Sequence, residues 1–153
     1  MKYYIAYGSN LYKSQMKHRC PGARVAGTAT LKGWELLFKG SKTGSYLTIE
    51  QRIGREVPVA IWAITPSDEL RLDSYEGYPA FYYKREFTLK MMREDGSVKE
   101  IRAFAYIMHE DRKVGVPSDY YMDVCEAGYE DFKFDRRILM DAFARSMALA
   151  RAV

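Results

Sequence analysis

The fold is decided by one near-continuous apolar stretch, Val57-Pro58-Val59-Ala60-Ile61-Trp62-Ala63-Ile64. It has the length of a strand, contains several β-branched residues, and is closed by Thr65-Pro66. We therefore expect residues 57–64 to form a central strand of a sheet.

The residues before this strand predict further extended segments. Aromatic and β-branched residues favour strands at 2–7, 23–38 and 46–50, whereas 11–19 could form one or two helical turns. Residues 40–44 are expected to form a loop. Most of the first third of the chain is thus predicted to be β-structure.

The residues after it alternate between helix and strand. Thr65 or Ser67 can cap a helix over 66–76, with Pro66 in its first turn. Strands at 82–92 and 98–108 are joined by residues 94–97, whose turn chemistry predicts a hairpin.

Two helices are expected to end the chain. Ser118 can cap the first, which should stop near Gly128, and Asp135 can cap the second, which should run to about Ala150. Strand connections are short except for the one through the 66–76 helix, so we predict an α+β fold: a small, mixed, mainly antiparallel β-barrel with flanking helices. The length of 153 residues predicts a single domain over 1–153.

Composition excludes several classes of function. Apolar residues make up 48% of the chain, and the net charge of +4 is not concentrated in any basic block, so nucleic acid is not an expected partner. The start of the chain has no apolar signal segment, and no apolar run approaches the ~20 residues of a membrane span. We expect a cytoplasmic protein with no membrane partner, and the oligomeric state stays open.

Cofactor and metal chemistry also lack a sequence signal. Cys20 and Cys125 have no metal-binding or disulfide-scaffold spacing and are expected to be buried or half-buried thiols. His18 and His109 are expected at the surface, and no phosphate-binding, dinucleotide-binding or serine-hydrolase motif is present. We therefore expect no metal and no cofactor, which leaves cofactor-free chemistry or plain binding.

The first candidate motif is Tyr7-Gly8-Ser9-Asn10-Leu11, which directly follows a predicted strand. Around a glycine, consecutive backbone N–H groups can point into one concavity that binds an anion or a carbonyl oxygen. The alternative is a simple turn in which Ser9 or Asn10 caps the next helix, and the motif alone favours that alternative.

The second motif is Leu72-Asp73-Ser74-Tyr75-Glu76-Gly77. A carboxylate at the end of a helix faces the negative end of the helix dipole, and aromatic neighbours desolvate it, so both effects raise its pKa. Such a group is a better general base and, once protonated, a usable acid. The alternative is that Asp73 and Glu76 only decorate a solvated helix end.

The third motif is Pro117-Ser118-Asp119-Tyr120-Tyr121. Adjacent helix positions differ by about 100°, so at most one of the two tyrosines fits the core and the other faces a cleft or solvent. Aromatic packing with one hydroxyl in water is the alternative.

Taken together, in this order and at these separations, the three motifs resemble the γ-glutamylcyclotransferase family, including its AIG2-like branch. The likeness extends through Met16-Lys17-His18-Arg19-Cys20-Pro21 and Gly33-Trp34 and covers roughly residues 2–130. It implies a small barrel with one cavity, and an enzyme of acyltransferase or lyase type that cyclises a γ-glutamyl amino acid or γ-glutamyl amine to 5-oxoproline.

The resemblance also implies roles for individual residues. The backbone of Tyr7, Gly8, Ser9, Asn10 and Leu11 would bind the γ-glutamyl group. Glu76 would be the catalytic acid and base, and Tyr121 would hydrogen-bond the substrate or the glutamate. A further aromatic position falls on Tyr83, or on Tyr82 if the spacing after Tyr78 is counted differently.

Such a reaction needs no protein nucleophile, because the substrate's own α-amine attacks its δ-carbonyl in a five-membered ring closure. Two departures from the family leave the leaving amine open: Ala60 where a glycine is frequent, and residues 125–132, which lack a Gly-Leu-Pro turn. A non-catalytic module that binds a small molecule or a partner through the same pocket is the competing hypothesis.

The 13 tyrosines add one more expectation. Eleven fall in the three windows that hold the motifs, and Tyr46 and Tyr106 fall elsewhere. We expect the clustered tyrosines to form the wall of one cavity around Glu76.

Overall fold

Strand β3 (Gly44–Ile64) is the element on which the barrel closes. It pairs antiparallel with β1 (Lys2–Ala6) and, along much of its length, antiparallel with β2 (Arg24–Ser41). The computed structural model describes residues 1–41 and 43–152. Lys42, inside the expected 40–44 loop, and Val153 lie outside the described residues.

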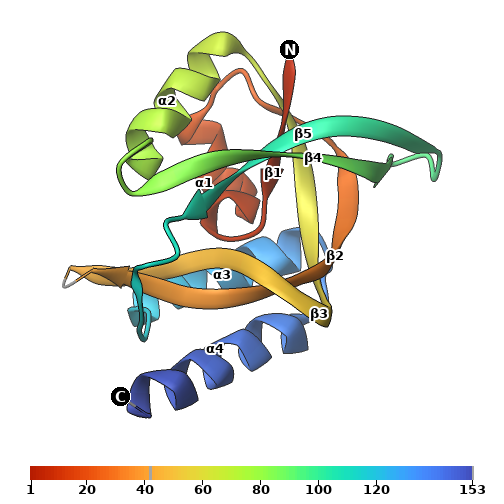
Figure 1. Cartoon of the computed structure of the whole chain (residues 1–153). Helices are drawn as coiled ribbons and strands as arrows, with labels where there is room; N and C mark the ends of the chain where they lie inside the picture. Colours follow the sequence, from red (N-terminus) through yellow and green to blue (C-terminus); the bar gives the residue numbers. More distant parts are fainter. Residues whose placement is uncertain (42, 153) are drawn as a thin grey trace.

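The remaining barrel strands are β4 (Tyr82–Met92) and β5 (Val98–Met108), which form the predicted antiparallel hairpin. β4 pairs antiparallel with β2 and β5 pairs parallel with β1, so the strand ring β3-β1-β5-β4-β2 returns to β3. A two-residue strand, β6 (Lys113–Val114), adds to the outer part of β2. The predicted α+β class and the mixed, mainly antiparallel barrel are confirmed (Figure 1).

The apolar stretch at 57–64 does lie at the centre of the sheet. Ile61 stands opposite Ile5 of β1 and Gly27 of β2, and Val57, Val59, Ala60 and Ile61 are fully buried. The prediction of two separate strands, at 46–50 and 57–64, is wrong, however, because both segments belong to β3. The residues between these two segments are exposed, and here the register between β2 and β3 shifts. Gly33 of β2 and Gly54 of β3 adopt positive φ angles at this shift.

Helix α2 (Pro66–Glu76) has the predicted bounds. Of the two proposed caps, Thr65 is the one used: its hydroxyl accepts from the Asp68 N–H, and the Asp68 carboxylate accepts from the Thr65 N–H. Gly77 ends the helix at a φ of 64°, which places Glu76 in the last turn.

The other helices are a 3₁₀ turn, η1 (Ser9–Leu11), followed by α1 (Lys13–Arg19), and the two final helices α3 (Asp119–Asp131) and α4 (Arg136–Arg151). Ser118 and Asp135 cap the final helices as predicted. α3 does not stop near Gly128. That glycine lies inside the helix against Leu11, where an added Cβ would come within 2.5 Å of the Leu11 Cβ, so it permits close packing rather than ending the helix.

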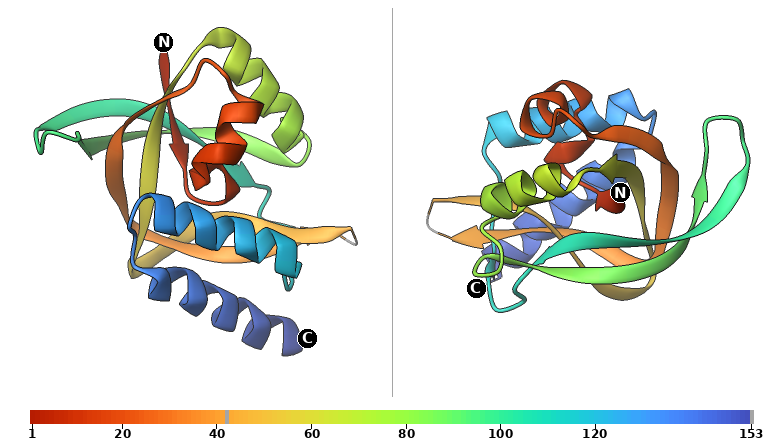
Figure 2. Two further views of the ribbon diagram at one scale, coloured as in Figure 1. Left: turned by 180° about the vertical axis from the view of Figure 1, so that it is seen from behind. Right: turned by 90° about the horizontal axis from the view of Figure 1, so that it is seen from above.

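The helices cover the barrel from two sides. Seen from behind, α3 and α4 run side by side along the β2–β3 ribbon, while α2 lies at the end where β1 begins and α1 lies between α2 and α3 (Figure 2). α4 packs on β2, where the Ser146 hydroxyl accepts a hydrogen bond from the Phe38 N–H. Within residues 1–41 and 43–152, none of these helices combines the length and apolar character that a membrane crossing requires.

Candidate active site

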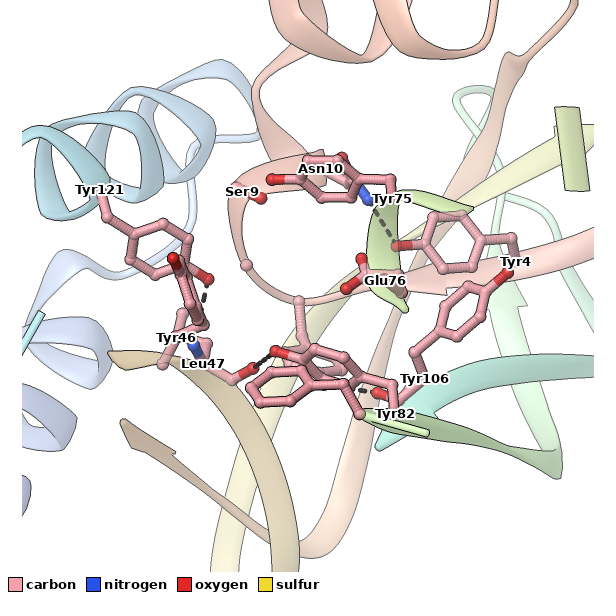
Figure 3. Close-up of a pocket in the computed structure, with 13 residues that line it drawn as sticks. Tyr4, Ser9, Asn10, Tyr46, Leu47, Tyr75, Glu76, Tyr82, Tyr106 and Tyr121 are labelled. Carbon is pink, nitrogen blue, oxygen red and sulfur yellow. Dashed lines mark hydrogen bonds between the residues drawn. The ribbon is translucent and has the colours of Figure 1, made fainter. Parts of the chain in front are cut away.

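A cavity of about 220 Å³ opens where the end of α2, the η1 turn, the middle of the barrel and α3 meet. At roughly 30 Å³ per water molecule, this is the space of about seven waters, enough for a group of glutamyl size. Its lining is mostly aromatic: Tyr4, Tyr7, Gly8, Ser9, Asn10, Tyr46, Leu47, Tyr75, Glu76, Phe81, Tyr82, Tyr106 and Tyr121. Figure 3 shows these side chains converging from several elements on one space.

Glu76 provides the carboxylate among the lining residues. Its side chain points from the last turn of α2 into the middle of the ring of tyrosines (Figure 3). Desolvation by these surroundings raises the pKa of Glu76 to about 7, and the positive charge of Arg19 opposes that rise. A carboxyl group with this pKa can both accept and release a proton near neutral pH.

The turn facing Glu76 does not serve as a helix cap. Among the described residues, no side chain caps η1 or α1, so neither Ser9 nor Asn10 caps the following helix as the simple-turn alternative expected. Instead, the Asn10 side chain donates to the Tyr4 hydroxyl at 2.9 Å and accepts from Arg19. The Asn10 carbonyl accepts from the Trp62 indole, which fixes the turn to β3.

The backbone amides of this turn are divided between two uses. The Leu11 N–H donates to the Gly8 carbonyl at 3.0 Å, closing the turn. The N–H groups of Ser9 and Asn10 lie in the first turn of η1, and within residues 1–41 and 43–152 neither donates to a backbone carbonyl outside η1. They belong to residues of the cavity lining and are donors that a bound oxygen could use.

Tyr82 and Tyr121 both bind one residue of β3, Leu47. The Tyr82 hydroxyl donates to the Leu47 carbonyl at 2.9 Å, and the Tyr121 hydroxyl accepts from the Leu47 N–H at 3.0 Å. Since Tyr121 uses its oxygen as the acceptor there, its proton remains to be donated to the neighbouring Cys125 sulfur, with which the Tyr121 side chain shares a hydrogen bond, or to a bound group. As their spacing predicted, the two tyrosines face different surroundings: Tyr121 lines the cavity, whereas Tyr120 is exposed.

Two predicted site residues lie outside the cavity lining. Alternate residues of a strand face opposite sides, so β4 directs Tyr82 inward and Tyr83 outward, where the Tyr83 hydroxyl donates to Glu110. Of the two tyrosines that the resemblance left open, Tyr82 is therefore the one that lines the cavity. Leu11 is fully buried against Gly128 and contributes packing rather than a cavity surface.

The expectation about the tyrosines is right in part. Seven tyrosines line the cavity, but six from the three windows do not: Tyr3, Tyr12, Tyr78, Tyr83, Tyr120 and Tyr129. Tyr46 and Tyr106, which were placed elsewhere, do line it, because the barrel brings β3 and β5 beside the motifs. Phe81, which precedes β4, and Leu47 of β3 were also missed, since no local pattern marks either residue as facing a cavity.

Asp73 does more than decorate the end of α2. The Tyr106 hydroxyl donates to the Asp73 carboxylate at 2.6 Å, and Lys84 lies 2.8 Å from the same carboxylate. The backbone carbonyl of Tyr106 accepts from the Tyr7 hydroxyl. Asp73 thus holds one tyrosine of the cavity wall from behind.

The other reactive side chains are kept out of the site. Cys20 and Cys125 are buried, as predicted, and desolvation raises the pKa of Cys20 to about 11 and that of Cys125 to about 12. Both are therefore thiols at neutral pH, not nucleophilic thiolates. His18 is exposed, but His109 is partly covered and lies against the Tyr83 ring. Residues 1–41 and 43–152 contain no cluster of three or more His, Cys, Asp or Glu suited to a metal ion.

Comparison with known proteins gives a consistent result. The family model described as "Gamma-glutamyl cyclotransferase, AIG2-like" matches residues 4–123. The human protein named gamma-glutamylcyclotransferase is 30% identical over 135 residues, which cover 84% of this chain and 70% of that protein, and the mouse protein of the same name is 29% identical over the same shares. A solved structure titled "Gamma-glutamyl cyclotransferase" superimposes with a TM-score of 0.74 at 26% identity, covering 97% of this chain and 87% of the other.

Proposed function

Because this chain belongs to the gamma-glutamyl cyclotransferase, AIG2-like family, we propose that it converts a γ-glutamyl amino acid or γ-glutamyl amine to 5-oxoproline and the free amine. The observation that carries the proposal is the Glu76 carboxylate, which points into a cavity of glutamyl size whose lining also includes Ser9 and Asn10. Its pKa of about 7 suits a group that must take up and return one proton.

In the first step, Glu76 removes a proton from the substrate's α-ammonium group. The free amine then attacks the δ-carbonyl carbon, forming the ring C–N bond while the carbonyl electron pair moves onto oxygen. The N–H groups of Ser9 and Asn10 and the Tyr121 hydroxyl are the donors available to the developing oxyanion.

In the second step, the electron pair returns from oxygen and the bond to the leaving nitrogen breaks. Glu76 gives its proton to that nitrogen, then takes the second proton from the ring nitrogen and passes it to the released amine, which leaves as an ammonium ion. Glu76 is again ionised, so each turnover ends with the enzyme unchanged. The reaction is intramolecular, and the wall of tyrosines contributes by holding the glutamyl chain folded with the amine close to the carbonyl.

The proposal is tested by incubating the protein with a panel of γ-glutamyl dipeptides and γ-glutamyl amines and following 5-oxoproline. We expect Glu76→Gln to lower kcat by at least about a hundredfold, the size of effect usual for general acid–base catalysis. Glu130→Gln, a matched change at an exposed glutamate in α3, should leave the rate unchanged.

Equal turnover by wild type and Glu76→Gln would remove Glu76 from the mechanism. Binding of γ-glutamyl compounds with no 5-oxoproline from any member of the panel would support the competing hypothesis, a small-molecule binding module with the same fold.

A further inference from the structure

Arg19, the last residue of α1, lies behind the cavity wall and contacts two of its residues. The centre of its guanidinium group stands 3.4 Å above the centroid of the Tyr75 ring. One of its N–H groups donates to the side-chain oxygen of Asn10. Tyr75 belongs to α2 and Asn10 to the η1 turn, so Arg19 bridges the two elements that carry Glu76 and the turn amides.

We propose that Arg19 is a positioning residue for Glu76: it holds the end of α2 against the η1 turn and keeps a positive charge beside the carboxylate. The inference rests on the proposed function, because it assumes that Glu76 must be ionised to start the reaction. It adds a residue that is not itself part of the cavity lining.

The positioning follows from the donor and acceptor inventory of Asn10. Its side-chain nitrogen donates to the Tyr4 hydroxyl, and its side-chain oxygen accepts from Arg19. A guanidinium group can only donate, so it permits one orientation of the Asn10 amide. With both ends of that amide engaged and its backbone carbonyl bound by Trp62, the turn is fixed relative to the barrel.

The electrostatic part follows from what surrounds Glu76. Besides Arg19 of α1, the titratable groups of the described residues that interact with it are tyrosines of β1, β4, β5 and α3 and the tyrosine that follows β1: Tyr4, Tyr82, Tyr106, Tyr121 and Tyr7. Burial raises the pKa of each of these tyrosines, so they are neutral near pH 7. Among the groups recorded as acting on Glu76, Arg19 is the one that opposes the desolvation of its carboxylate.

Three variants separate charge from geometry. Arg19→Gln removes the charge but retains an amide donor, whereas Arg19→Lys retains the charge but cannot stack as a plane on Tyr75. Lys17→Gln is the matched control, because it removes a positive charge from an exposed position in the same helical turn. Thermal unfolding of each variant verifies that it is folded.

The first readout is the titration of the Glu76 carboxyl group, followed by ¹³C NMR of protein labelled at glutamate, with Glu76→Gln to assign the signal. We expect Arg19→Gln to raise the midpoint by about one pH unit, as loss of a nearby opposite charge does. Arg19→Lys and Lys17→Gln should leave the midpoint within about 0.3 unit of wild type, far below that shift.

The second readout is the pH profile of 5-oxoproline formation. With the midpoint one unit higher, the ionised fraction at pH 7 falls about fivefold, and the rate of Arg19→Gln should fall with it and recover by pH 9. Arg19→Lys should keep the profile and lose several-fold in kcat/KM at every pH, because the turn is held less firmly.

An unchanged Glu76 midpoint in Arg19→Gln, or an equal shift in Lys17→Gln, would overturn the inference. The titration needs no substrate, so it decides the role of Arg19 even if the panel yields no 5-oxoproline. In that event the proposed function fails, and the electrostatic link between Arg19 and Glu76 is judged separately.

Discussion

The Tyr121 hydroxyl of α3 accepts a hydrogen bond from the backbone N–H of Leu47 in β3 at 3.0 Å. The two residues are 74 positions apart in the sequence. Their contact joins the wall of the cavity formed by the last third of the chain to the strand on which the barrel closes.

Tyr121→Phe should therefore lower stability as well as activity. The change leaves the Leu47 N–H without its acceptor, and an unpaired N–H of this kind costs about 1–3 kcal/mol. Urea unfolding measures the loss, with Tyr120→Phe, at the exposed neighbouring position, as the control. If both variants unfold at the same urea concentration as wild type, this hydrogen bond contributes nothing to stability.

The raised pKa of Glu76 predicts a stability that depends on pH. Burial raises the value from about 4.5 to about 7, so the folded protein holds a proton that the unfolded chain has already released. The free energy of unfolding should therefore fall as pH rises from 4.5 through 7 and then level off. Since Glu76 is only partly buried, we expect a fall of about 1–3 kcal/mol.

Glu76→Gln should remove this dependence and be more stable than wild type at pH 8. Unfolding by urea at pH 5 and pH 8 gives the two free energies, and Glu130→Gln should follow the wild-type curve. A wild-type protein that gains stability between pH 5 and 8 relative to Glu76→Gln would contradict the sign of the pKa shift.

The adjacent residues Tyr82 and Tyr83 provide a test of which face of β4 serves the cavity. Tyr82→Phe removes a hydroxyl from the cavity wall and the bond to the Leu47 carbonyl, so kcat/KM should fall by about tenfold, the equivalent of one lost hydrogen bond. Tyr83→Phe removes a hydroxyl that binds Glu110 outside the cavity, and its kcat/KM should stay within about twofold. A larger loss of kcat/KM in Tyr83→Phe than in Tyr82→Phe would show that Tyr83, not Tyr82, serves the site.

Substrate binding is expected to require glycine at position 8, because a side chain there would narrow the cavity. A Cβ at this position would lie 3.3 Å from the Tyr121 hydroxyl oxygen and 3.4 Å from the Leu47 Cβ, both part of the cavity wall. We expect Gly8→Ala to raise KM for γ-glutamyl substrates by roughly tenfold, which equals about 1.4 kcal/mol of binding. Gly8→Ala should raise KM less in a Tyr121→Phe background than in wild type, and an equal rise in both backgrounds would show that the added methyl group acts elsewhere.

Local sequence signals were sufficient for most of the fold. The apolar run at 57–64, the Thr65-Pro66 start and the Gly77 end of α2, and the turn at 94–97 each determine an element through its own residues. The errors came where a tertiary contact overrides the local signal. Gly128 resembles a helix end but lies within α3, because the close approach of Leu11 requires a residue without a side chain.

The cavity residues likewise comprise some that local motifs mark and others that only the tertiary structure reveals. Glu76, Ser9 and Asn10 could be expected in the cavity from two short motifs, each made of consecutive residues. Tyr46 and Tyr106 could not, because what brings them to the cavity is the pairing of strands distant in the chain. The choice between Tyr82 and Tyr83 depended on the register of β4, which the sequence left open by one residue.

The parallel pairing of β1 with β5 has a consequence for how the protein is made. Tyr7, at the end of β1, binds the carbonyl of Tyr106 across 99 positions of sequence, and α3 follows later still. During synthesis, the N-terminal motif must wait until β5 and α3 have left the ribosome before the cavity exists. Such distant contacts slow folding, so an incomplete chain exposes the apolar surface of β1 until its C-terminal partners arrive.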